Sequence, residues 1–207
     1  GYFGDLILTP VKDQAYSKTT YNQLGLLWDN KVLGRLEASL GVLDYNYYFT
    51  SILQTEAGVV PDRLDGQQWL GMASWEKDFG LFQLDARGGL GLSGDLTGSY
   101  LDAGLSIPIG KRYLFRAGLH HRAAKPEFNM LLYQSDYLNY NWDNSQGFEN
   151  QQVQSLMAEL RSDYWGTLKA QVSSMDKYAY FASVASAEEI AEGQERSLIR
   201  PFQFGER

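Results

Sequence analysis

The sequence predicts an all-β fold, an antiparallel up-and-down meander that forms all or part of a transmembrane outer-membrane β-barrel. Three observations predict it: apolar residues recur at every second position, tight and long connections alternate along the chain, and aromatic residues gather near both ends of the expected strands. At 207 residues the chain is also long enough to bury a core.

The clearest alternation lies in Leu81–Leu92, where Leu84 and Ala86 alternate with Asp85 and Arg87. Successive side chains of a strand point to opposite faces, so one face of this strand is apolar and the other is polar and charged. Five further segments follow the same rule: Leu36–Val42, Leu101–Ile107, Tyr113–His121, Leu156–Leu160 and Leu168–Val172. Counting less regular segments, we expect eight strands, or nine if Tyr2–Thr9 forms one.

The connections between these segments are alternately tight and long. The tight ones lie at 29–32, 76–80, 108–111 and 162–166, and the longer ones at 50–66, 93–98 and 123–151. A meander places alternate connections at opposite ends of the sheet, so one end carries all the tight turns, as the periplasmic end does in outer-membrane barrels. We expect the two longest connections to face outward and to be able to fold in and narrow a pore.

Aromatic side chains mark both ends of the strands, which predicts two girdles at membrane–water boundaries. At the long-connection end these are Tyr45, Tyr47, Tyr48, Phe49, Tyr178, Tyr180 and Phe181. At the tight-turn end they are Trp28, Trp75, Phe79, Tyr164 and Trp165.

The polar faces of the expected strands carry charges of both signs. An unpaired charge in a dry core costs on the order of several kcal/mol, and a water-filled lumen avoids this cost because the charge stays hydrated. The wet face of a soluble sheet is the alternative, and the asymmetric turns and aromatic girdles favour the lumen. We therefore predict these pore-lining residues: Arg35, Glu37, Asp85, Arg87, Asp102, Arg116, Glu159, Arg161 and Lys169.

Composition disfavours several function classes. A formal charge of −7 provides no basic stripe for nucleic acid, and the absence of cysteine removes disulfides, thiolate metal sites and cysteine nucleophiles. The glycines of 89–94 match a dinucleotide fingerprint but are followed by another alternating segment instead of a helix. We therefore expect that the protein is not an enzyme and that it has no catalytic residue and no cofactor.

The histidines and the oxygen-rich loop give no metal site. His120 and His121 are adjacent on a strand, so they point to opposite faces, and neither has an obvious serine–acid relay. The loop residues Asp136, Asn139, Asn141, Asp143 and Asn144 lack the spacing of an EF-hand, and ordinary turn chemistry is the favoured interpretation.

Three motifs carry a family resemblance: FNMLLYQSDYLNYNWDN at 128–144, YAYF at 178–181 and RPFQ at 200–203. In this succession, on a strand background, the chain resembles the putative porin family of Bacteroidota outer membranes. The resemblance implies a transport barrel in the bacterial outer membrane, surrounded by its lipid. It supplies no catalytic residues.

The whole chain, 1–207, is expected to form one β-barrel domain, with 182–200 a loop that could contain a short helix. Because it ends on Gly205, Glu206 and Arg207 instead of an aromatic residue, we expect part of a larger barrel. The predicted function is passive diffusion of small hydrophilic solutes.

Two alternatives remain. One is a non-conducting barrel subunit whose aromatic loop residues, Tyr133, Tyr137, Tyr140 and Trp142, dock outer-membrane protein partners. The other is a soluble glycan-binding β-sandwich, in which the apolar faces would pack against each other.

Overall fold

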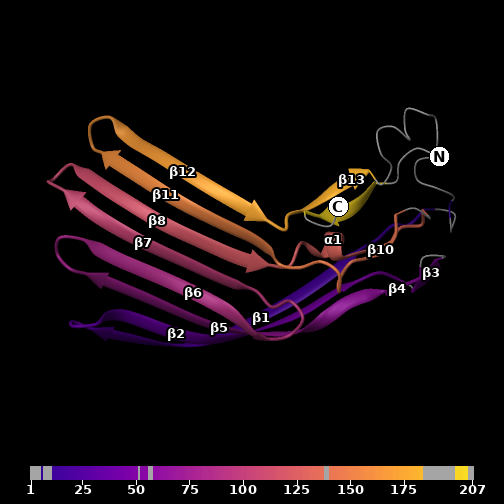
Figure 1. The fold of residues 1–207 in the computed structure, drawn as a ribbon. Coiled ribbons are helices and arrows are strands. Elements are labelled where there is room, and N and C mark those ends of the chain that lie inside the picture. Colours follow the sequence, from indigo (N-terminus) through magenta and orange to yellow (C-terminus); the bar gives the residue numbers. More distant parts are fainter. Residues whose placement is uncertain are drawn as a thin grey trace.

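The structure is a computed structural model that describes residues 6, 11–50, 52–55, 58–137, 140–183 and 199–204. Eight long antiparallel strands form one sheet, and consecutive long strands are neighbours in it (Figure 1). In sheet order the strands are β1 (Tyr16–Asn30), β2 (Gly34–Tyr48), β5 (Arg63–Asp78), β6 (Gln83–Ser93), β7 (Ser99–Ile109), β8 (Tyr113–Ala124), β11 (Gln151–Ser162) and β12 (Gly166–Asp176). The predicted meander is confirmed.

Shorter elements occupy the long connections and the C-terminal region. They are the hairpins β3 (Leu53–Thr55) with β4 (Gly58–Val60), β9 (Leu132–Tyr133) with β10 (Trp142–Asp143), and β13 (Ala179–Ser183) with β14 (Ile199–Gln203), and the helix α1 (Phe128–Leu131). No helix among the described residues is long and apolar enough to cross a membrane.

The four predicted tight turns all lie at one end of the sheet (Figure 1). Each of these hairpins contains a glycine at positive φ, a conformation that costs glycine little because it has no Cβ. These glycines are Gly34 (86°), Gly80 (81°), Gly110 (62°) and Gly166 (103°). The turn chemistry therefore fixes which end of the sheet is short and which carries the long connections.

Two of the eight strands were not among the six regular segments. On β1 and β5 the second face is partly apolar as well, with Leu27, Leu70 and Met72 on the face that carries Glu37 and Ser39 of β2. Met72 is in contact with Tyr21, whose hydroxyl lies 3.5 Å from the Met72 sulfur. This packing removes the clean alternation that identified the other strands.

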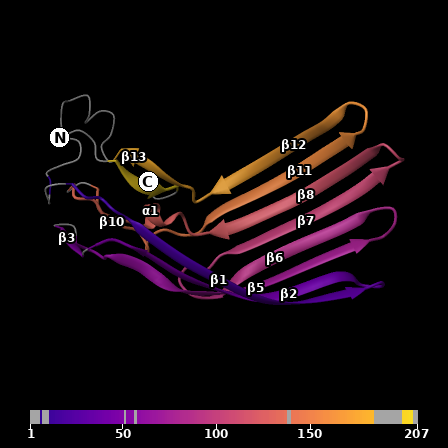
Figure 2. The same cartoon turned by 180° about the vertical axis from the view of Figure 1, so that it is seen from behind.

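Figures 1 and 2 show the sheet bent into a trough, with α1 between its two arms at the long-connection end. Among the described strands, β1 and β12 each have a single neighbour in this sheet, so the sheet is not closed. The buried apolar residues of the described chain gather where the long connections pack onto it, and Leu131 and Leu132 are 1% and 0% exposed.

Two predicted segments fall largely outside the described residues. Of Tyr2–Thr9 only Leu6 is described, and it forms an isolated bridge with Tyr137. The predicted helical turn lies in 184–198, which the structure does not describe. The RPFQ motif lies in β14, which pairs with β13 in antiparallel register.

Candidate functional site

The strand register places all nine predicted pore-lining residues on one face of the sheet, here called the inner face. Arg87, for example, is the cross-strand partner of Asp102, and Glu159 is the partner of both Arg116 and Lys169. Cross-strand partners lie on the same face of a sheet. The Phe128 ring in α1 stacks on Tyr45 and Tyr47, which share the inner face of β2 with Glu37, so this face lines the inside of the trough.

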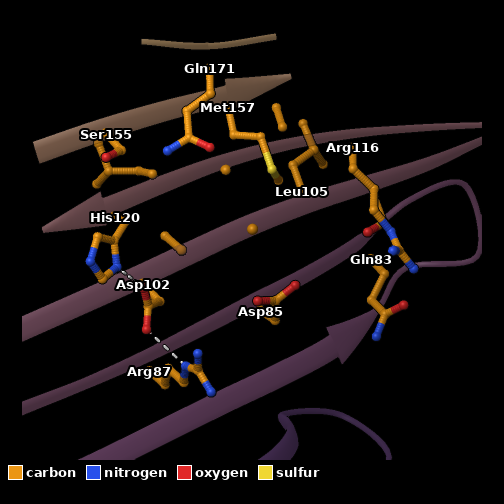
Figure 3. A pocket seen from close by; sticks show the side chains of 16 residues that line it. Gln83, Asp85, Arg87, Asp102, Leu105, Arg116, His120, Ser155, Met157 and Gln171 are labelled. Atoms are coloured by element: carbon orange, nitrogen blue, oxygen red, sulfur yellow. Dashed lines mark hydrogen bonds and ion pairs between the residues drawn. The ribbon is translucent and has the colours of Figure 1, made fainter. Parts of the chain in front are cut away.

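A polar row crosses the inner face from strand to strand. In register it runs Glu37, Ser74, Arg87, Asp102, His120, Ser155 and Ser173. At its centre Arg87 Nε donates to Asp102 Oδ2 at 2.9 Å, and the other Asp102 oxygen is hydrogen-bonded to His120 Nδ1 (Figure 3). Further along the row, Ser155 Oγ and Ser173 Oγ share a hydrogen bond of 2.8 Å.

These central groups are accessible to water. The side chains of Arg87, His120 and Asp102 are 68%, 43% and 25% exposed. An accessible charge keeps most of its hydration and avoids the large desolvation penalty of a dry interior. The inner face is therefore a wet, charged surface.

Glycines give this surface its hollows. A Cβ on Gly104 would lie 2.6 Å from an Asp85 carboxylate oxygen, so the missing side chain leaves room for that carboxylate. The Tyr100 ring lies against Gly89 in the same way, at 2.5 Å from a Cβ built there. Two adjoining hollows result, of about 520 Å³ beside Asp85 and His120 and about 470 Å³ beside Tyr100 and Arg122 (Figure 3 shows the first).

The opposite, outer face is apolar and uncovered. Leu24, Leu26 and Val172 are 81%, 80% and 75% exposed, and no second layer covers this face among the described residues. Apolar patches this continuous mark a surface that contacts something other than water. On β5 two tryptophans bound the patch: Trp69 Nε1 donates to Gln67 Oε1 at 3.1 Å, and Trp75 Nε1 donates to the Leu33 carbonyl at 2.8 Å.

The connection between β8 and β11 folds inward at the long-connection end. Its described residues, 125–137 and 140–150, are here called the cap. Phe128 stacks on Tyr45 and Tyr47 with ring centroids 5.7 and 5.4 Å apart. Gln134 Nε2 donates to the Pro61 carbonyl at 2.6 Å, which ties the cap to the connection between β2 and β5.

The cap also has its own core. Tyr133 stacks on Trp142 at 5.0 Å, and the Trp142 indole donates to the Asn129 carbonyl at 3.0 Å. Burial raises the pKa of the Tyr133 phenol, and the negative charge of the nearby Asp13 carboxylate raises it further. Two of the four aromatic residues expected at a partner interface are thus used inside the cap, and Trp142 is buried.

The predicted girdle at this end is partly wrong. Tyr45, Tyr47 and Phe49 are 5%, 7% and 5% exposed. Tyr45 and Tyr47 alternate in phase with Glu37, so they lie on the inner face, where the cap and its neighbours cover them. Trp28 and Trp75 at the other end do lie on the outer face, in one row with Leu36.

The histidines separate as expected: His120 is the partner of Asp102 on the inner face, and His121 is the partner of Leu101 on the outer face. The carboxylate next to His120 was not predicted from the sequence. Asp102 lies 18 residues earlier and becomes a neighbour only through the register of the β7–β8 hairpin. A shift of one residue in that turn would have paired His120 with Leu101 or Ala103 instead of Asp102.

Backbone groups of the cap bond to the oxygen-rich loop residues Asn141, Asp143 and Asn144, whereas the Asp136 carboxylate accepts from Lys12 N at 2.6 Å. Asn141 Oδ1 accepts from Ser135 N at 2.9 Å, and Asp143 Oδ1 accepts from Ser145 N at 3.0 Å. Asn139 lies outside the described residues. Within the described part of the chain, no group of three or more His, Asp or Glu side chains could hold a metal ion.

A two-faced antiparallel meander, charged inside and apolar outside, defines the class of proteins whose sheets form β-barrel walls. A family model described as "Putative porin" matches residues 2–206, and the chain belongs to this family. No curated protein matches the chain.

Proposed function

We propose that this chain forms part of the wall of an outer-membrane barrel through which small hydrophilic solutes diffuse passively. The observation that carries the proposal is the opposition of the two faces: exposed leucines and valines outside, hydrated charges of both signs inside. Lipid would cover the first surface and water would fill the space along the second. Membership of the porin family supports this assignment.

Two tryptophans bound the apolar segment of the outer face along β5. Trp69 and Trp75 on β5 are six residues apart, which corresponds to about 20 Å along a strand. Their polar ring atoms bond to groups beyond the two ends of the apolar segment, as expected for aromatic residues at membrane–water boundaries. Because barrel strands are tilted by about 35–45°, this length spans about 15 Å of the roughly 25 Å tall apolar band of an outer membrane.

The apolar band also runs obliquely to the cross-strand rows. On β1 it extends over Leu24–Trp28 and is centred on Leu26, whose row leads across the sheet to Ser174 on β12. On β12 the apolar segment Leu168–Val172 is instead centred on Ala170. Strands that are tilted relative to the membrane give this displacement, and barrel strands are tilted by about 35–45°.

The test is planar-bilayer conductance of the purified full-length protein, with heat-denatured protein and detergent alone as controls. Stable single-channel steps support the proposal. A folded barrel, recognised by β-rich circular dichroism and heat-dependent gel mobility, that gives no steps would overturn it.

That second outcome would favour the alternative of a non-conducting barrel subunit. One observation supports this alternative: the cap packs onto the inner face at one end of the trough. The soluble β-sandwich is disfavoured, because it requires a second layer on the apolar face and that face is exposed throughout the described strands.

A further inference from the structure

The charges of the inner face are segregated across the sheet, between its first five strands and its last three, here called the first and the second arm. On the first arm, β1 to β7, carboxylates outnumber cations by six to two: Asp29, Glu37, Glu76, Asp78, Asp85 and Asp102 against Arg35 and Arg87. On the second arm, β8, β11 and β12, cations outnumber carboxylates by four to one: Arg116, Arg122, Arg161 and Lys169 against Glu159. With His120 neutral, the arms carry formal charges of opposite sign.

Close pairing does not cancel this separation. Among the described residues, the inner-face ion pair within 4.0 Å joins Arg87 to Asp102, whose other carboxylate oxygen is hydrogen-bonded to His120. The hollow beside them continues from Asp85 on the first arm to Arg116 on the second (Figure 3). A solute in this hollow would have an excess of negative charge on one side and of positive charge on the other.

We propose that this transverse charge separation selects zwitterionic solutes, such as free amino acids, over uncharged solutes of the same size. The inference rests on the proposed function, since it requires solutes to pass along the inner face. A zwitterion has no net charge but can orient its ammonium towards the acidic arm and its carboxylate towards the basic arm. An uncharged isomer gains much less from the same field.

Isomer pairs isolate the effect from size. Glycine and glycolamide have the same composition, as do β-alanine and lactamide, and only the first of each pair is a zwitterion at neutral pH. In liposome-swelling assays with the full-length protein at low ionic strength, we expect the zwitterion to enter about two to five times faster. The preference should be larger for β-alanine, whose charges are further apart, and should shrink at about 1 M salt, where the Debye length falls to about 3 Å.

A charge exchange between the arms tests the cause. Glu37→Lys combined with Lys169→Glu keeps the net charge of the protein but reduces the charge on each arm. We expect this variant to lose most of the preference. The control is Lys111→Glu combined with Asp163→Lys, two reversals in tight-turn connections that leave the strand charges of both arms unchanged, and this variant should keep the preference.

The outcomes separate the two proposals. Equal rates for both members of each pair, or a preference that survives the exchange between arms, would overturn the transverse selection while leaving a porin-like barrel in place. No swelling with any solute, from a protein whose gel mobility shows it to be folded, would overturn the proposed function and this inference with it.

Discussion

Adjacent residues on β5 give the sharpest test of which face meets lipid. Ala73 lies on the outer face between the levels of Trp69 and Trp75, and Ser74 lies on the inner face between Glu37 and Arg87. The perturbation is one arginine, introduced as Ala73→Arg or as Ser74→Arg. The same side chain then samples opposite faces at nearly the same depth.

The expected free-energy costs differ widely. An arginine facing lipid costs about 2–4 kcal/mol at the bilayer midplane and less towards the interface. Ala73 is two residues from Trp75, about 7 Å along the strand, so we expect Ala73→Arg to destabilise the barrel by about 2 kcal/mol. Ser74→Arg faces water beside Glu37, and its effect should stay within about 0.5 kcal/mol.

Urea unfolding of the protein in lipid vesicles measures both values, with tryptophan fluorescence and gel mobility as independent probes. The predicted difference corresponds to about a 30-fold change in the folding equilibrium. An Ala73→Arg variant as stable as the wild type, or a Ser74→Arg variant that is the less stable of the two, would refute the assignment of the faces.

Three further results are expected. Gly104→Val places a side chain where the Asp85 carboxylate lies, so it should displace that carboxylate and shift the reversal potential in a salt gradient towards anion selectivity. An unchanged reversal potential would show that Asp85 does not act on permeating ions. Phe128→Ala removes the stacking on Tyr47 and should loosen the cap by about 2 kcal/mol, seen as faster proteolysis of 125–150 in a folded barrel; wild-type protease resistance would contradict this packing. Burial raises the pKa of the Tyr133 phenol, so the stabilisation of the cap by the neutral phenol is complete below the unfolded-state pKa of 10.0 and is lost as the pH rises above it. Loosening of the cap at alkaline pH should therefore be weaker in Tyr133→Phe, and equal alkaline sensitivity of the two proteins would contradict this role.

Most of the sheet could be predicted from local sequence because its two faces meet different surroundings. Leu84 and Asp85 must lie on opposite faces whatever the rest of the chain does, and the positive-φ glycines limit where the tight turns can lie. The alternation fails on β5, where Met72 occupies a polar-face position and contacts Tyr21, because that contact depends on a strand 51 residues away.

The site was predictable by face and not by contact. The alternation of side chains along each strand places Asp102 and His120 on the inner face, but only the register of the hairpin makes them partners. The inward fold of the 123–151 connection was expected, but its packing was not: its aromatic residues suggested an exposed interface, whereas Phe128 stacks on two tyrosines from a distant strand. The same alternation along β2 would have placed Tyr45 and Tyr47 on the inner face, since they lie an even number of residues from Glu37.

The chain contains no cysteine, so single cysteines can report directly on both the pore and its faces. The decisive measurement is single-channel current of the full-length protein during addition of a water-soluble, charged thiol reagent, with Asp102→Cys and Ala103→Cys compared. We predict that the reagent reduces the current through the Asp102→Cys protein and leaves the Ala103→Cys protein unaffected, because Asp102 lies on the inner face, the proposed lumen side, and Ala103 lies on the outer face. A block at Ala103→Cys with none at Asp102→Cys would contradict the account, and so would a folded protein without current.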